Sequence, residues 1–197
     1  MTDIALTSLL KQVRACTLCA AQLPLGPRPV VQISESARIV IIGQAPGLKV
    51  HETGKPWNDP SGIRLRQWLN LTDTDFYDEN KVAIMSMGFC YPGRGKSGDL
   101  PPRPECAPQW HNPLLELLPN IKLTLLIGQY AQNYYLKDPH KTLTDRVMHW
   151  REFPEGMFAL PHPSPRNQIW LKKNSWFEED ALPELQQRVR QALNESD

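Results

Sequence analysis

Four cysteines are spaced in a way that suits metal binding. Cys16 and Cys19 form a CxxC pair, and Cys90 and Cys106 form a second, wider pair within a proline-rich stretch. The N-terminus shows no basic segment followed by an apolar run, so we expect no secretion signal and no disulfides. Four thiolates suit a tetrahedral zinc site or a [4Fe–4S] cluster, and their spacing does not separate the two. Either group would tie the N-terminal segment to the 90–106 segment.

The segment HPSPRN, at 162–167, places a histidine beside groups that bind phosphate. His162 follows an apolar run and lies between two prolines, which restrict its backbone. Ser164 and Asn167 can hydrogen-bond to phosphate, and Arg166 can pair with it. A lone histidine is more often structural, but this combination favours a functional site.

Two further segments combine turn-forming residues with candidate binding groups. GQAPG, at 43–47, can make a tight turn with exposed backbone N–H groups, although glycines after a strand are usually only turns. It is not a GxGxxG motif, so a dinucleotide site is disfavoured. In GKPWNDPSG, at 54–62, Trp57 could stack on a nucleobase or fill a core. The candidate binding residues of the first segment are Gln44, Ala45, Pro46 and Gly47.

Four apolar runs predict the strands that would position these segments. They lack polar alternation, as strands buried on both faces do, and span 38–43, 81–87, 122–128 and 157–161. Helices are expected over 4–15, after an N-cap at Ser61, after Pro104, over 129–137, and from the HPSPRN segment to about Ala192. Strands that alternate with helices predict one α/β domain over 1–197, an α/β/α sandwich around a parallel sheet of about four strands. In such sheets ligands bind beyond the carboxyl ends of the strands, where these segments lie.

Composition and charge exclude several classes of protein. The formal net charge of +1 excludes a uniformly polybasic binder, and 19 prolines in 197 residues predict stiff connections. Positive charge is concentrated in three segments, 44–66, 91–105 and 162–173, which together contain ten Lys or Arg residues and four Asp or Glu residues. If these segments meet in space, their excess of positive charge favours a polyanionic partner. No apolar run approaches the ~20 residues that span a bilayer. We expect a monomer with no membrane partner and a cytoplasmic, nucleoid-associated location.

The sequence GQAPGLKVHETGKPWNDPSGIRLRQWL, the four cysteines and HPSPRN together resemble the iron–sulfur, family 4-like branch of the uracil-DNA glycosylase superfamily. The resemblance extends from Cys16 to the helix after Trp170. It implies an α/β/α fold and a pocket at the strand ends that receives a base flipped out of DNA. It also favours a [4Fe–4S] cluster over zinc as the cofactor.

The resemblance implies roles for individual residues. Gln44 and Ala45 match the loop that holds the hydrolytic water, and Trp57 matches the aromatic residue that stacks on the base. His162 matches the histidine that stabilises negative charge on the departing base. Arg166 and its neighbours match the loop that enters the DNA minor groove.

Two positions depart from the pattern of that branch. Gln44 replaces a glutamate, and Ser86 replaces an asparagine that reads the edge of uracil. Glutamine can orient a water molecule but cannot deprotonate it, and Glu52 is the nearest acid in the sequence that can substitute for the glutamate. Departure of the nucleobase as an anion depends more on a fixed hydrogen-bond donor than on a strong proton acceptor. His162 therefore remains the main catalytic candidate.

These departures leave more than one function open. The first is a DNA repair glycosylase that hydrolyses the N-glycosidic bond of uracil or a related damaged or deaminated base, slowly or with a substrate other than uracil. The alternative is a module of the same fold that binds DNA or a lesion without cleaving it. A third is a hydrolase of free nucleosides or nucleotides that uses the same pocket.

Overall fold

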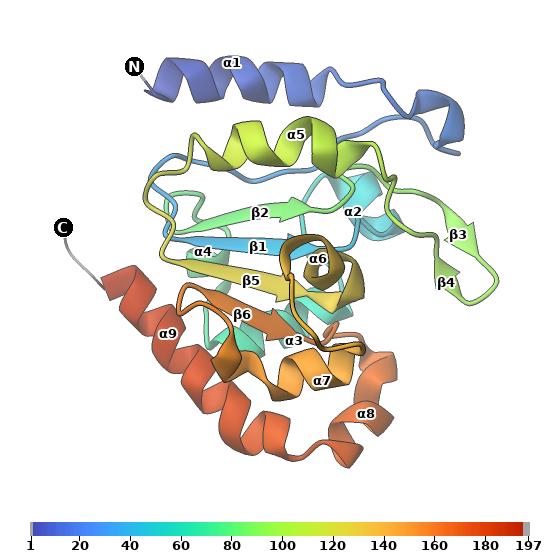
Figure 1. Cartoon of the computed structure of the whole chain (residues 1–197). Coiled ribbons are helices and arrows are strands. Elements are labelled where there is room, and N and C mark those ends of the chain that lie inside the picture. The colour runs from blue at the N-terminus through green and yellow to red at the C-terminus, as the bar shows by residue number, and fades with distance from the viewer. Residues whose placement is uncertain (1, 195–197) are drawn as a thin grey trace.

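The central feature of the fold is a four-stranded parallel sheet with strand order β2–β1–β5–β6 (Figure 1). The structure is a computed structural model, and it describes residues 2–194. The strands are β1 (Ile39–Gly43), β2 (Val82–Ser86), β5 (Leu123–Ile127) and β6 (Met157–Leu160). All four expected strands are confirmed to within about one residue at most ends, because runs of buried apolar residues define them.

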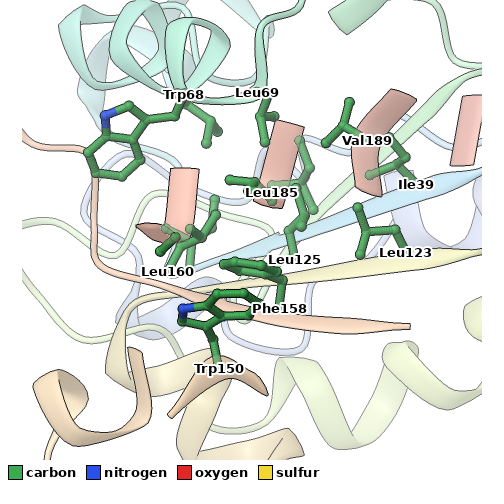
Figure 2. Packing of buried hydrophobic residues seen from close by; sticks show 14 of the residues in the cluster. Ile39, Trp68, Leu69, Leu123, Leu125, Trp150, Phe158, Leu160, Leu185 and Val189 are labelled. Atoms are coloured by element: carbon green, nitrogen blue, oxygen red, sulfur yellow. The ribbon is translucent and has the colours of Figure 1, made fainter. Parts of the chain in front are cut away.

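Helices cover both faces of the sheet, which confirms the predicted α/β/α sandwich (Figure 1). Successive strand residues point to opposite faces. Ile39, for example, packs in the cluster on one face and Val40 in the cluster on the other. The first face is covered by α3 (Pro60–Leu69), α7 (Leu143–Met148) and α9 (Leu182–Asn194), as Figure 2 shows for part of the cluster. The second is covered by α1 (Thr2–Arg14), α5 (Cys106–Leu115) and α6 (Gly128–Tyr135).

Several connections differ from the expectation. Ser61 is not the N-cap of α3: the Asp59 carboxylate caps it by accepting a hydrogen bond from the Gly62 N–H at 2.8 Å, and Pro60 is the first helical residue. Likewise α5 begins at Cys106 rather than at Pro104. Short elements interrupt the expected loops, namely η1 (Ala20–Gln22), α2 (Leu48–Thr53), α4 (Asp73–Phe76) and the hairpin of β3 (Arg94–Gly95) and β4 (Gly98–Asp99).

The C-terminal segment is not one continuous helix. It consists of η3 (Pro165–Asn167), α8 (Gln168–Lys173), the π-helical turn η4 (Phe177–Ala181) and α9. Phe177 and Leu185 of this segment are fully buried against the sheet. Within residues 2–194, none of the helices has the length and apolar character to cross a membrane.

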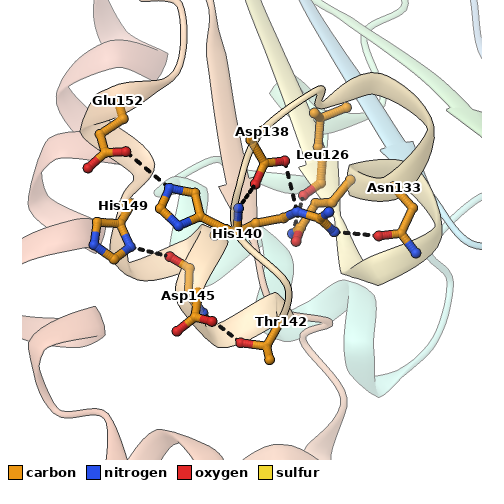
Figure 3. A network of polar contacts seen from close by, with 10 residues as sticks. Leu126, Asn133, Asp138, His140, Thr142, Asp145, His149 and Glu152 are labelled. Atoms are coloured by element: carbon orange, nitrogen blue, oxygen red, sulfur yellow. Dashed lines mark hydrogen bonds and ion pairs between the residues drawn. The ribbon is translucent and has the colours of Figure 1, made fainter.

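A polar cluster orders the connection between α6 and β6, which includes η2 (Trp150–Glu152) (Figure 3). His140 stacks on His149 with ring centroids 4.3 Å apart, and it pairs with Glu152 at 3.0 Å. Asp138 accepts a hydrogen bond from Arg146 at 3.0 Å. None of these side chains lines the pocket described next, so the cluster shapes the connection rather than the site.

Candidate active site

A cavity of about 520 Å³ opens where β1, β2 and β6 end. Its size is in the usual range for small-molecule sites, and its place is where open parallel sheets bind ligands. Four segments that are distant in sequence form its walls: the turn after β1, the Trp57 loop, the β3–β4 hairpin and the HPSPRN segment. The polar and aromatic groups among its lining residues are Gln44, Trp57, Asp59, Ser61, Ser86, Arg94, Ser97, Asp99, His162, Ser164 and Arg166.

The turn after β1 is held by the neighbouring strand and the hairpin. The Gly43 carbonyl accepts a hydrogen bond from the Met87 N–H at 2.8 Å, and the Gln44 carbonyl accepts one from the Gly88 N–H at 3.0 Å. The Gln44 side chain donates through Nε2 to the Leu100 carbonyl at 3.3 Å. Because this bond uses the NH₂ end of the amide, the oxygen end is left as an acceptor for a water molecule or a ligand.

In the Trp57 loop, Trp57 itself has a left-handed backbone conformation that the sequence did not predict. Trp57 has φ of 53°, a conformation that costs a residue with a Cβ about 1–2 kcal/mol. Its carbonyl accepts a hydrogen bond from Arg66 Nη1 at 3.3 Å, and the Tyr77 hydroxyl shares its one hydrogen between the Pro56 carbonyl at 3.0 Å and the Trp57 carbonyl at 3.4 Å. A Cβ on Gly62 would overlap this carbonyl, and one on Gly43 would lie 2.9 Å from the indole. Two glycines therefore fix the place of the ring.

His162 lies beside this indole in the wall of the pocket. The centroid of the imidazole lies 5.7 Å from that of Trp57 at an interplanar angle of 36°. Asn167 Nδ2 donates to the His162 carbonyl at 2.7 Å and fixes the backbone after β6. Burial lowers the pKa of His162, and the Asp59 carboxylate opposes this shift only in part. The imidazole is therefore neutral near pH 7 and can donate one N–H to a ligand.

Below the pocket, a buried histidine supports the end of β2. His111 Nε2 lies 3.0 Å from the Ser86 carbonyl, and Nδ1 lies 2.6 Å from the Tyr135 hydroxyl. A carbonyl only accepts, so Nε2 carries the proton and Nδ1 accepts from Tyr135. Burial lowers the pKa of His111 to about 4, which keeps the ring neutral. His111 was not predicted from the sequence, although a histidine among the apolar residues of α5 was a usable signal.

The structure brings most of the candidate site residues together. Gln44, Ala45, Pro46, Gly47, Trp57, Ser86, His162, Ser164 and Arg166 all line the pocket. Asn167 lies behind it, where its amide holds the His162 backbone. Glu52 is exposed and does not line the pocket, and its carbonyl accepts a hydrogen bond from Arg28. Sequence reasoning missed Asp59, Arg94 and Asp99, which also line it.

The four cysteines line one second, smaller cavity on the side of the sheet covered by α5. None forms a disulfide, and Phe89 and Trp110 contribute apolar walls. The Phe89 N–H donates to Cys106 Sγ at 3.3 Å. Burial raises the pKa of Cys90 to about 11 and that of Cys106 to about 12. The donor set, four thiols in an apolar cavity, fits a group that binds thiolates.

The arrangement of these thiols bears on the kind of group that they could hold. Within residues 2–194, no three His, Cys, Asp or Glu side chains lie close enough together to hold one metal ion. One zinc ion with Zn–S bonds of about 2.3 Å brings its sulfur atoms to about 3.8 Å from each other. A [4Fe–4S] cluster would bind each thiolate at a different iron atom, so the four thiols around one cavity suit either group and do not separate the two.

The fold and the pocket together define an α/β protein with a ligand site at the carboxyl ends of a parallel sheet. The chain matches the family model of the Uracil DNA glycosylase superfamily over residues 30–186. It belongs to this superfamily, whose members act on DNA. The matched region contains the sheet and every residue that lines the pocket, whereas Cys16 and Cys19 precede it.

Proposed function

We propose that this protein is a DNA glycosylase that receives a damaged or deaminated base in the pocket and hydrolyses its N-glycosidic bond. The observation that carries the proposal is that a neutral His162 and Trp57 lie side by side in the wall of a cavity at the strand ends. An aromatic face beside a fixed N–H donor suits a base that leaves as an anion. Membership of the superfamily supports the same reaction class.

His162 contributes by stabilising the leaving group. Breaking the C1′–N bond develops positive charge on the sugar and negative charge on the base, and a donor already in place lowers the energy of that state. Asn167 and the flanking prolines fix the imidazole before a ligand arrives, so little reorganisation is needed. Gln44 offers its amide oxygen to the attacking water.

The cations at the pocket support a DNA partner. Arg94 and Arg166 line the opening, where they can neutralise phosphates on either side of a flipped nucleotide. Arg64 donates to the Ser164 carbonyl at 3.0 Å and so holds the HPSPRN segment near α3. Because phosphate contacts supply most of the affinity, binding to DNA should weaken as salt rises.

We propose that Cys16, Cys19, Cys90 and Cys106 hold a [4Fe–4S] cluster with a structural role. The shared apolar cavity that all four cysteines line supports it. When bound, the cluster would cross-link the segment after α1 to both ends of the 90–106 segment. Protein purified without air should be brown and absorb near ~400 nm, whereas colourless protein with stoichiometric zinc would contradict the proposal.

A panel of oligonucleotides tests the glycosylase activity. Single strands and duplexes that carry one uracil, hypoxanthine or xanthine are incubated with excess protein, and alkali-labile breaks are quantified. Cleavage of at least one substrate, slowed about 10²–10³-fold by His162→Ala, is the expected result. Gln44 and Ser86, where the branch it resembles has Glu and Asn, favour the second candidate, a module that binds a lesion without cleaving it. Lesion-specific binding with no product would establish that candidate instead.

A further inference from the structure

The β3–β4 hairpin carries an acidic side chain into the pocket. Asp99 ends β4 and lines the cavity together with Gln44 and His162. Its carboxylate lies against the turn after β1, since a Cβ on Gly47 would lie 3.4 Å from Asp99 Oδ2. A carboxylate from a distant segment thus reaches the turn whose own side chain, Gln44, has no charge.

Two candidate catalytic segments, the turn after β1 and the HPSPRN segment, hold the hairpin in this position. Arg166 Nη1 donates to the Ser97 carbonyl at 3.3 Å, which ties the HPSPRN segment to the hairpin two residues before Asp99. Gln44 Nε2 donates to the Leu100 carbonyl at 3.3 Å, one residue after it. The Leu100 N–H also donates to the Gly93 carbonyl at 2.8 Å and closes the hairpin. These hydrogen bonds to the two segments therefore determine where Asp99 lies.

The other carboxylate that lines the pocket, that of Asp59, already forms a structural hydrogen bond. Asp59 Oδ1 accepts a hydrogen bond from the Gly62 N–H at 2.8 Å as the N-cap of α3. The Asp99 carboxylate, in contrast, forms no hydrogen bond or ion pair to another side chain among residues 2–194. It is available to a ligand.

Charged groups near Asp99 come from three of the four segments that form the pocket. Burial raises the pKa of Asp99, Arg94 on β3 and Arg166 after β6 oppose the shift, and Asp59 at α3 adds to it. Asp99 in turn contributes to a raised pKa of Tyr91, whose largest cause is burial. A carboxylate that ionises less readily than usual is a better proton acceptor.

We propose that Asp99 is a catalytic residue that supplies the carboxylate absent from position 44. This inference rests on the proposed glycosylase function. The water oxygen forms a bond to C1′ while the C1′–N bond breaks and its electron pair leaves with the base. Asp99 accepts the proton that the water loses, and the base anion, which His162 stabilises, takes a proton from solvent. The ionised carboxylate, as a negative charge in the same cavity, also favours the positive charge that develops on the sugar.

The test compares Asp99→Asn with Asp59→Asn. Each change removes one negative charge from the pocket and keeps the size of the side chain, and asparagine remains a good N-cap at position 59. Single-turnover cleavage of the best substrate is measured from about pH 4 to pH 8, together with affinity for the same DNA and the melting temperature. The wild-type rate should rise with pH as Asp99 ionises and then level off.

We expect Asp99→Asn to lose about 10²-fold or more in rate and to lose this rise with pH, while DNA affinity and melting temperature change little. Asp59→Asn should keep the rise. Wild-type protein that cleaves, with Asp99→Asn within about threefold of it, would overturn the inference and leave the glycosylase function intact. Parallel losses of affinity and rate in Asp99→Asn would also overturn it. Wild-type protein that binds lesions without cleaving any of them would overturn both.

Discussion

The position of Trp57 should depend on the absence of a side chain at residue 62. Gly62→Ala adds a methyl group to the first turn of α3, where alanine would ordinarily favour a helix by about 1 kcal/mol over glycine. In this structure the new Cβ would overlap the Trp57 carbonyl and lie 2.9 Å from the Trp57 Cβ. The loop must therefore move away from the helix.

The cost of this movement exceeds the gain in helix propensity. Displacing the carbonyl weakens its hydrogen bonds to Arg66 and Tyr77, which are worth about 1 kcal/mol each. Overpacking adds about 1–3 kcal/mol. We expect a net destabilisation of at least about 2 kcal/mol, which in a domain of this size lowers the melting temperature by about 4–8 °C. The displaced indole should also reduce lesion-specific binding.

Thermal unfolding followed by circular dichroism measures the first effect, and titration of lesion and normal oligonucleotides measures the second. Ile63→Ala is the matched control, because Ile63 is the next residue of α3 and its side chain is exposed. The control should melt within about 2 °C of the wild type. A Gly62→Ala protein that melts as high as the wild type, with unchanged preference for the lesion, would refute the explanation of the Trp57 backbone.

Three further predictions follow from the site. His162→Ala should lower the single-turnover rate about 10²–10³-fold with little change in DNA affinity; a less stable but fully active variant would contradict this. Arg166→Ala should weaken DNA binding and reduce the salt slope by about 1, measured by titration at several salt concentrations. Because burial lowers the native pKa of His111 to about 4, the unfolded chain takes up this proton first. The free energy of unfolding, measured in urea, should thus fall by about 3 kcal/mol between pH 6.5 and pH 4, and His111→Phe should flatten that slope.

The sheet could be predicted from the sequence because its signal is local. The run over 38–43 is apolar at nearly every position, and a strand buried on both faces needs that pattern. The N-cap of α3 was mistaken because Asp59 and Ser61 are both good caps and only two residues apart. The β3–β4 hairpin was missed because strands of two residues have no periodicity.

The site was predictable in part for the same reason. His162 and Gln44 follow strands directly, so the end of each strand fixes their place. Asp99 lies in a loop whose path depends on contacts with residues 44 and 166, and no local pattern encodes these. Glu52 was a candidate through its nearness in sequence, but α2 carries it to an exposed position. The Trp57 backbone packs against Gly62 and its indole against Gly43, and no local sequence pattern encodes these two contacts.

The four cysteines of the thiol cavity come from two segments that are far apart in the sequence, and this matters while the chain is being synthesised. Cys16 and Cys19 leave the ribosome about 90 residues before Cys106, and α1 packs on α5, which begins only at that cysteine. At about 5–20 residues per second, the first two thiols wait roughly 5–20 s before their partners exist. Exposed thiols are open to oxidation during that time. We therefore expect the yield of protein with all four thiols intact to fall when the surroundings of the nascent chain are made more oxidising.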